Sequence, residues 1–387
     1  MWTALHIIDW LLWLIMACSV VYVAFFAFAS LFHRKKKPYS TFEIRQSSFL
    51  ILYPAYKEDA VILHSVRQFL EQKYPKALYQ VAVISDHMTE TTNEQLSQLP
   101  VTLHTLRYEK SSKAKALQYA MRHTEGGYDY VVILDADNVV LPDFLQQLNA
   151  SCQKGHHAIQ CHRCAKNSNN NIAVLDGISE EINNTIFRKA HNTLGLSSAL
   201  IGSGMCFDFN WFKEHVEHLS SAVEDRELES RLILERIFIK FEEHIYVYDE
   251  KVSSHDNFER QRLRWLNGQL QTLLVMLPHI PHAIATGNIN YVDKTIQQAL
   301  IPRSVLLILI PLFALAMLFL APVWSVKWWV LFLILCLSLY IAIPSQLRTR
   351  TLLGKLISFP VLALGMLKNL FYLDKNNKDF LHTTHGE

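Results

Sequence analysis

The sequence predicts an α/β protein in which a mainly parallel, Rossmann-like sheet is combined with transmembrane helices at both ends of the chain. Two observations predict this. Short apolar runs typical of buried strands alternate with helical patterns between residues 47 and 258. Long apolar stretches that could cross a bilayer lie before and after that region. The absence of repeats and low-complexity linkers favours a single soluble domain.

Strands are expected where apolar runs end in polar residues. The four clearest runs are 47–56, 79–87, 101–108 and 128–140. Helical spacing follows the first run at 58–72 and the third at 113–124. In sheets of this kind ligands collect at the carboxyl ends of the strands, so the polar residues there are the first candidates for a site.

The N-terminal apolar stretch, residues 5–32, contains one acid, Asp9, and is expected to be a membrane span and not a cleaved signal peptide. The basic run 33–37 follows it at once and places the next domain in the cytosol. Two further spans are expected at 299–321 and 327–345. Segment 356–373 is either a span or an interfacial helix.

Composition excludes some functions. A net charge of +2 provides no basic surface to offset a nucleic-acid backbone, so nucleic acid is not an expected partner. Six cysteines in a protein facing the cytosol are expected to be free thiols. Cys161 and Cys164 raise the question of a zinc site, but the alternating segment around them favours a strand. The tail histidines His382 and His385 could reach a metal or a ligand.

Carboxylates follow the fourth strand and begin a later helix. Asp135 and Asp137 lie two residues apart at a strand end, which suits Mg²⁺ or Mn²⁺, although a capped turn is the simpler alternative. Glu224 and Asp225 open a strongly helical segment. Acids favour that position because of the helix dipole, but Asp225 could also act as a general base.

Two further segments carry residues suited to binding. Gly202, Ser203 and Gly204 form a turn that would let the backbone approach a ligand closely. Gln261, Arg264 and Trp265 share one stripe of a helix just before the membrane spans. An amide, a fixed cation and a flat ring together suit an anionic, ring-shaped ligand, whereas the alternative is an interfacial helix with snorkelling arginines.

In order along the chain, YPAYKED, ISDHM, KAKALQ, DAD, GSGM, VED and QRLRW resemble the motif series of membrane-bound family 2 glycosyltransferases. That group includes cellulose, chitin and hyaluronan synthases and ceramide glucosyltransferases. The resemblance covers about residues 50–265 and implies a GT-A fold, a nucleotide-sugar donor, a divalent metal and inversion at the anomeric carbon. Departures such as Ser85, His87 and Lys57 fall in the nucleotide pocket and leave the base open.

The resemblance implies a role for each matching residue. Asp86 is expected to contact the nucleobase beside Tyr56 and Glu58, and Lys113 to lie near the nucleotide. Asp135 and Asp137 are expected to form the diphosphate–metal site, and Asp225, with Glu224 beside it, to act as the catalytic base. Arg264 and Gln261 are expected to contact the diphosphate. Trp265 is expected to form the acceptor platform together with Gly202, Ser203 and Gly204. His255 is a candidate extra metal ligand, with a solvated loop histidine favoured.

The expected activity is inverting transfer of a hexose from a nucleotide diphosphate sugar, with UDP favoured, to a growing glycan. The alternative is transfer of one sugar to a lipid. A transport component and an inactive homologue are disfavoured, the first because Arg303 and Asp9 are almost the only charges in the expected spans. Expected partners are the donor, the glycan or lipid acceptor, the bilayer and candidate export proteins, at a bacterial inner membrane.

These expectations divide the chain into five parts. An N-terminal membrane helix (1–33) is followed by a cytosolic catalytic domain (34–257) and by amphipathic interfacial helices (258–298). A membrane region of two or three helices (299–373) and a polar tail (374–387) complete the chain.

Overall fold

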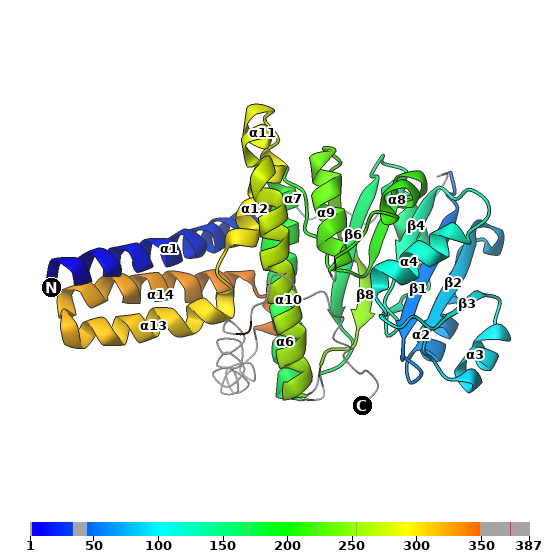
Figure 1. The fold of residues 1–387 in the computed structure, drawn as a ribbon, viewed down its shortest axis with the longest axis horizontal. Coiled ribbons are helices and arrows are strands. Elements are labelled where there is room, and N and C mark those ends of the chain that lie inside the picture. Colours follow the sequence, from blue (N-terminus) through cyan, green and yellow to red (C-terminus); the bar gives the residue numbers. More distant parts are fainter. Residues whose placement is uncertain are drawn as a thin grey trace.

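The computed structural model describes residues 2–33, 45–168, 170–221, 223–252, 254–348 and 372. Most of the basic run 33–37, nearly all of segment 356–373, and the tail with His382 and His385 lie outside the described residues. Three layers follow one another in Figure 1: a bundle of apolar helices, a group of connecting helices, and a domain built on one sheet.

The described residues form an eight-stranded mixed sheet with the order β3-β2-β1-β4-β7-β6-β8-β5. The half from β3 to β4 is parallel, as predicted, whereas β7 runs antiparallel between β4 and β6, and β5 pairs antiparallel with β8. β6 and β8 are parallel. The strands are β1 Phe49–Tyr56, β2 Tyr79–Asp86, β3 Thr102–Leu106, β4 Tyr130–Ile133, β5 Val139–Val140, β6 Ala158–Ala165, β7 Met205–Asp208 and β8 Ile239–Asp249.

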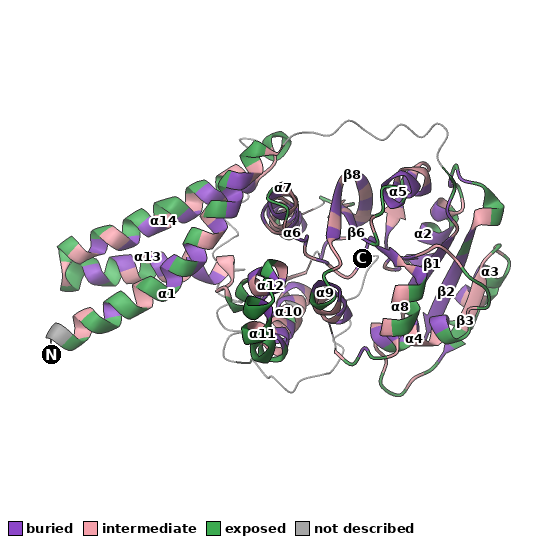
Figure 2. Ribbon diagram, turned by 90° about the horizontal axis from the view of Figure 1, so that it is seen from above, coloured by how far each residue is buried: buried purple, intermediate pink, exposed green. Residues whose placement is uncertain are grey.

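Both faces of the sheet are buried, which explains why its strands are continuously apolar. Along β1, Phe49, Ile51 and Tyr53 pack into one hydrophobic cluster, and Leu50 and Leu52 pack into another. Figure 2 shows the purple strands with α2 and α5 on one side and α4 and α8 on the other. The helices of this domain are α2 Ile62–Phe69, α3 Glu90–Ser97, α4 Lys113–Arg122, α5 Phe144–Cys152, α8 Phe209–Val216 and α9 Glu224–Leu234.

Three helices are long and apolar enough to cross a membrane among the residues described: α1 Trp2–Ala29, α13 Arg303–Leu320 and α14 Pro322–Ala342. They form the bundle in Figure 1. The loop between the two spans expected at 299–321 and 327–345 is shorter than predicted, because only Ala321 separates α13 from α14. α14 already begins at Pro322, since proline fits the first turn of a helix. Lys327 is therefore helical and forms a 2.5 Å ion pair with Asp9 of α1.

The connecting helices lie between the bundle and the sheet (Figure 2). They are α6 Asn171–Asn183, its π-helical continuation η3 Asn184–Ala190, α7 His191–Thr193, α10 His255–Met276, α11 Ile280–Ala285 and α12 Ile289–Ala299. Short 3₁₀ turns complete the described chain at η1 Ser30–Phe32, η2 Lys76–Leu78, η4 Leu277–His279 and η5 Ser345–Leu347.

A buried polar cluster joins membrane helix α1 to the connecting helices. The Tyr22 hydroxyl donates a 2.6 Å hydrogen bond to Asp293 of α12. His191 lies 3.3 Å from the same carboxylate and stacks on Phe26 with a ring separation of 3.7 Å. Since α12 also leads into α13, this cluster connects the apolar helices to the domain built on the sheet.

Candidate functional site

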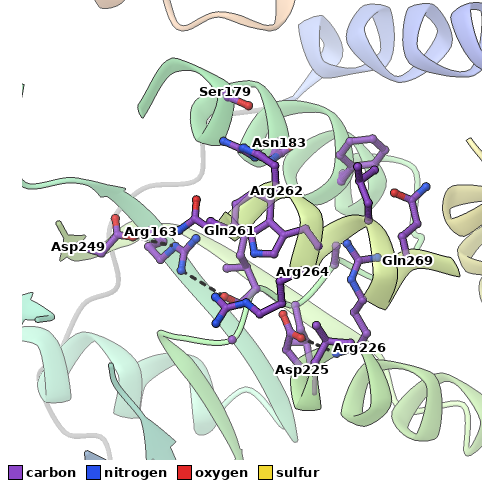
Figure 3. A pocket seen from close by; sticks show the side chains of 18 of the residues that line it. Arg163, Ser179, Asn183, Asp225, Arg226, Asp249, Gln261, Arg262, Arg264 and Gln269 are labelled. Atoms are coloured by element: carbon purple, nitrogen blue, oxygen red, sulfur yellow. Dashed lines mark hydrogen bonds and ion pairs between the residues drawn. The ribbon is translucent and has the colours of Figure 1, made fainter. Parts of the chain in front are cut away.

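One cavity of about 1020 Å³ extends from the carboxyl ends of β1, β2 and β4, past α10, to the inner ends of the membrane helices. Twelve residues that the sequence singles out line it: Tyr56, Glu58, Asp86, Lys113, Asp135, Asp137, Gly202, Glu224, Asp225, Gln261, Arg264 and Trp265. Residues far apart along the chain therefore converge on a single site (Figure 3).

The sheet places the first group of these residues side by side. Tyr56 and Asp86 are register partners at the ends of the parallel strands β1 and β2. Asp86 is buried, and His87 Nδ1 lies 2.6 Å from its Oδ1. The Tyr56 ring meets the His87 ring edge-on at 5.6 Å. Two rings beside a buried carboxylate suit a flat heterocycle that offers hydrogen-bond donors.

Lys113 connects the carboxylates at the centre of the cavity. Its ammonium bonds Asp135, donates to the Gly202 carbonyl at 2.6 Å and lies 3.4 Å from Glu224. Burial alone would lower the pKa of Lys113, but the nearby carboxylates, Asp135 foremost, raise it above its ordinary value. Lys113 therefore remains charged and joins β4, the 202 turn and α9.

The Asp135–Asp137 pair is positioned by the turn after β4. The Asp135 amide donates to Asn138 Oδ1 at 3.1 Å and to Ser203 Oγ at 3.2 Å, while Asp137 Oδ2 accepts from the Glu250 amide at 2.6 Å. Among the residues described, no group of three His, Cys, Asp or Glu side chains is arranged to hold a metal. Two carboxylates nevertheless fit Mg²⁺ or Mn²⁺ when phosphate oxygens and water supply the other ligands.

Glu224 and Asp225 begin α9 and face the same space. A β-carbon built on Gly202, where φ is +79°, would lie 3.7 Å from Asp225 Oδ2 and 3.9 Å from Glu224 Oε1. Burial raises the pKa of Glu224 to about 7, against the opposing effect of Lys113. Asp225 Oδ1 accepts a 2.9 Å hydrogen bond from the Arg226 amide. Glu224 could therefore exchange a proton near neutral pH, and both acids are placed where they could meet a hydroxyl in the cavity.

Helix α10 closes the opposite wall. Gln261, Arg264 and Trp265 all line the cavity, as their shared stripe predicts. Burial lowers the pKa of Arg264, while Glu224, Asp135 and Asp225 act in the other direction, so its guanidinium lies within electrostatic reach of all three. Figure 3 shows Arg264 between Arg262 and the Asp225 end of the site.

Three residues that the sequence predicts for the site lie outside the lining of the cavity: Ser203, Gly204 and His255. Ser203 is fully buried, where it bonds Asn138 and the Asp135 amide, and Gly204 packs beneath it, since a β-carbon there would meet Val247 Cγ2 at 3.0 Å. Both support the Asp135 turn from behind. His255 lies at the start of α10, 3.6 Å from Glu259 Oε1. None of the three lines the cavity.

The sequence interpretation missed several residues on the membrane side of the site. They line the cavity and include Arg163, Ser179, Asn183, Arg188, Arg262, Gln269 and Arg303. One signal was present: Glu180, Asn184 and Arg188 recur every four residues, which predicts a polar stripe along one face of a helix. In the structure Arg188 donates to Glu180 at 2.9 Å.

Comparison with known proteins decides the family. A family model described as glycosyltransferase like family 2 matches residues 47–268, more than half of the chain. The chain belongs to glycosyltransferase family 2. The predicted family, the α/β fold of GT-A type and the assignment as an enzyme of this family are therefore confirmed.

Two curated relatives are named beta-monoglucosyldiacylglycerol synthase, from Nostoc sp. and Trichormus variabilis. Each is 25% identical over 285 residues, which is 70% of this chain and 59% of the relative. The chain thus matches under two thirds of their length. The mannosyltransferase PcManGT from Pyrobaculum calidifontis, solved with GDP-Man and Mn²⁺, shares the fold with a TM-score of 0.55 at 16% identity, covering 89% of this chain and 94% of that one.

The contact between α10 and α9 in this glycosyltransferase leads to a first prediction. A β-carbon on Gly268 would lie 2.6 Å and 2.7 Å from the two γ-carbons of Val223, which precedes Glu224 and Asp225. Gly268→Ala must therefore move Val223. We expect it to cost about 1–3 kcal/mol of stability by overpacking and to lower transferase activity more than tenfold, as measured by thermal unfolding and nucleotide release.

The matched control removes the obstructing atoms. Adding Val223→Ala to Gly268→Ala deletes both γ-carbons, so the double variant should recover most of the activity, while Val223→Ala alone should lose little. Wild-type activity in Gly268→Ala would show that the α9 acids do not depend on this contact.

Proposed function

We propose that this protein transfers a hexose from a nucleotide diphosphate sugar, with UDP favoured as the nucleotide, to the hydroxyl of a membrane lipid, with inversion at the anomeric carbon. The observation that carries the proposal is the continuity of the cavity. The space beside Asp135, Asp225 and Arg264 is the same space that reaches Leu307 of α13 and Leu339 of α14.

The donor is assigned to the sheet end of the cavity. Tyr56, Glu58 and Asp86 would hold the nucleobase, and Asp135 with Asp137 would hold Mg²⁺ or Mn²⁺ against the diphosphate. A bound divalent cation would supply neutralising charge to the leaving nucleoside diphosphate. Lys113 and Arg264 add fixed positive charge on either side, and fixed charge in an enclosed site stabilises a departing anion without reorganisation.

Proton removal is assigned to Asp225. It begins α9 and borders the same space as Gly202 and Glu224. An acceptor hydroxyl there would give its proton to the carboxylate as its oxygen bonds the anomeric carbon and the diphosphate leaves from the opposite face. Glu224 is buried and lies 3.4 Å from the Lys113 ammonium, whereas Asp225 is only half-buried and is more accessible to an acceptor hydroxyl.

The membrane end of the cavity favours a lipid over a glycan acceptor. Beyond the polar residues that surround Arg303, this end of the cavity has apolar side chains from all three apolar helices, with Val23, Leu307, Phe332 and Leu339 among the contributors. A growing glycan would instead require polar side chains along its path. The names of the two curated relatives agree with a lipid acceptor. The basic run after the first apolar helix supports a cytosolic position for the catalytic domain, and the bacterial relatives favour a bacterial inner membrane.

The assignment of the base gives a second prediction. Asp225→Asn should lower sugar transfer at least about 100-fold, the usual contribution of a general base, while nucleotide and Mn²⁺ binding measured by calorimetry stay close to wild type. Glu224→Gln, which changes the neighbouring acid in the same way, should cause a smaller loss. The reverse order of the two variants would assign the base to Glu224.

The acceptor class gives a third prediction. Purified protein supplied with UDP-hexoses and Mn²⁺ should glycosylate diacylglycerol in mixed micelles and should not extend soluble oligosaccharides, as measured by mass spectrometry of both products. Leu339→Trp fills the apolar end and should lower lipid transfer about tenfold, equivalent to a cost of roughly 1–3 kcal/mol for overpacking.

Leu337→Trp is the matched control, because Leu337 lies on the same helix with 52% exposure and does not line the cavity. It should leave transfer unchanged. Extension of oligosaccharides with no lipid product would contradict the proposed acceptor.

A further inference from the structure

Three polar atoms on the membrane side of the cavity are buried with neither a hydrogen-bond nor an ion-pair partner of their own among the described residues: Gln261 Oε1, Arg262 Nε and Arg303 Nη1; a fourth, Arg163 Nε, lies 3.4 Å from Asp249. All three residues line the cavity. A buried polar atom left unpaired costs about 1–3 kcal/mol, so such atoms normally have a partner. Two donors and one acceptor gathered here indicate a ligand that brings the complementary groups.

Arg262 has an ion-pair partner, whereas Arg303 has none among the described residues. Arg262 forms a buried ion pair with Asp176 and stacks on Trp265, its guanidinium carbon 4.2 Å from the ring centre. Arg303 donates to Asn183 Oδ1 at 2.7 Å and to the Ser179 carbonyl at 3.4 Å, both of which are neutral. Within the described part of the chain no carboxylate lies within ion-pairing distance of Arg303. The Arg303 charge beside the cavity therefore has no ion-pair partner in that part of the chain.

The position of Arg303 separates two chemical environments. It is the first residue of α13, and Leu307, one turn further into the membrane helix, also lines the cavity. On the other side, Asn183, Ser179 and Arg262 point into the same pocket as Arg264 and Asp225 in Figure 3. A group held by Arg303 would therefore lie between acyl chains in the apolar end and a hydroxyl at the reaction centre.

We infer that the acceptor lipid carries a phosphodiester of one negative charge between its acyl chains and the hydroxyl that receives the sugar. This inference rests on the proposed function and narrows its acceptor. Arg303 Nη1 and Arg262 Nε donate to the phosphate oxygens, in the charge-assisted geometry that guanidinium groups favour. Gln261 Oε1 accepts from a hydroxyl of the headgroup. The Arg303 cation, which has no ion-pair partner among the described residues, would be neutralised by the phosphodiester charge.

The first arm of the test uses the wild-type protein and needs no variant. Phosphatidylglycerol, which has a phosphodiester and free hydroxyls, is compared with diacylglycerol, which has a hydroxyl alone, each in neutral detergent micelles with UDP-hexose and Mn²⁺. The KM for phosphatidylglycerol should be lower by about tenfold or more, the value of a charge-assisted hydrogen bond. Equal KM values would overturn the inference while leaving a lipid acceptor in place.

The second arm removes the charge. Arg303→Gln should raise the KM for phosphatidylglycerol about tenfold and leave that for diacylglycerol, and donor hydrolysis without acceptor, unchanged. Lys189→Gln is the matched control, because Lys189 is a cation on η3, the continuation of the helix that Arg303 contacts, pairs with Glu243 and does not line the cavity. It should change neither KM. An equal loss with both acceptors in Arg303→Gln would show a structural role for Arg303 and overturn the inference.

The third arm separates a lipid phosphate from free phosphate. Millimolar inorganic phosphate should compete with phosphatidylglycerol only. If it alters transfer to diacylglycerol equally, and Arg303→Gln abolishes that effect, the site binds free phosphate and the inference is wrong. Failure of both lipids together with extension of oligosaccharides would instead refute the proposed function itself.

Discussion

Like charges can be held together at the centre of this cavity only because cations lie between them. Asp135 and the adjacent acids Glu224 and Asp225 come from two separate segments, and the three carboxylates would repel one another in an enclosed site of low polarity. Lys113 contacts Asp135 and Glu224 directly, and Arg264 approaches from α10. This alternation fixes the turn at Gly202 against the sheet and the start of α9. It also explains why the pKa of Glu224 rises only to about 7 despite full burial.

Paired buried polar groups also connect the sheet domain to the apolar helices, through Tyr22, His191 and Asp293. His191 is fully buried, and burial lowers its pKa, so the ring is neutral at physiological pH. Burial alone would raise the pKa of Asp293, but His191, Lys294 and the Tyr22 hydroxyl hold it below its ordinary value. A charged Asp293 thereby anchors α1 to α12. Gln298, five residues further along α12, lines the cavity, so the membrane helices and the site share one support.

The parts of the site that the sequence predicts are those fixed by local pattern. Asp86 and Asp135 follow apolar strands whose parallel pairing is set by alternation with helices, so their convergence follows from topology. Gln261, Arg264 and Trp265 share a stripe because α10 is a regular helix. In both cases a short segment determines where its side chains point.

Other features depend on packing between distant segments. Whether Gly202, Ser203 or Gly204 faces the cavity depends on β7 pairing antiparallel with β4, where the Gly204 amide bonds the Ile133 carbonyl at 2.9 Å and turns Ser203 inward. Arg303 meets Asn183 only because α13 packs beside α6, 120 residues earlier in the chain. No local pattern encodes that approach, so the membrane half of the cavity emerges only from the folded chain.

The central claim, that one cavity holds the diphosphate site and the acyl chains of the acceptor, is tested most directly by photo-crosslinking. A diacylglycerol with a diazirine near the headgroup, bound with UDP and Mn²⁺, should label Phe332 and Leu339, which line the cavity on α14. Labelling of Leu333 and Leu337, 58% and 52% exposed on the outer face of α14, should be weaker and insensitive to competing unlabelled lipid. Equal labelling of both faces, with no effect of competitor, would contradict the account.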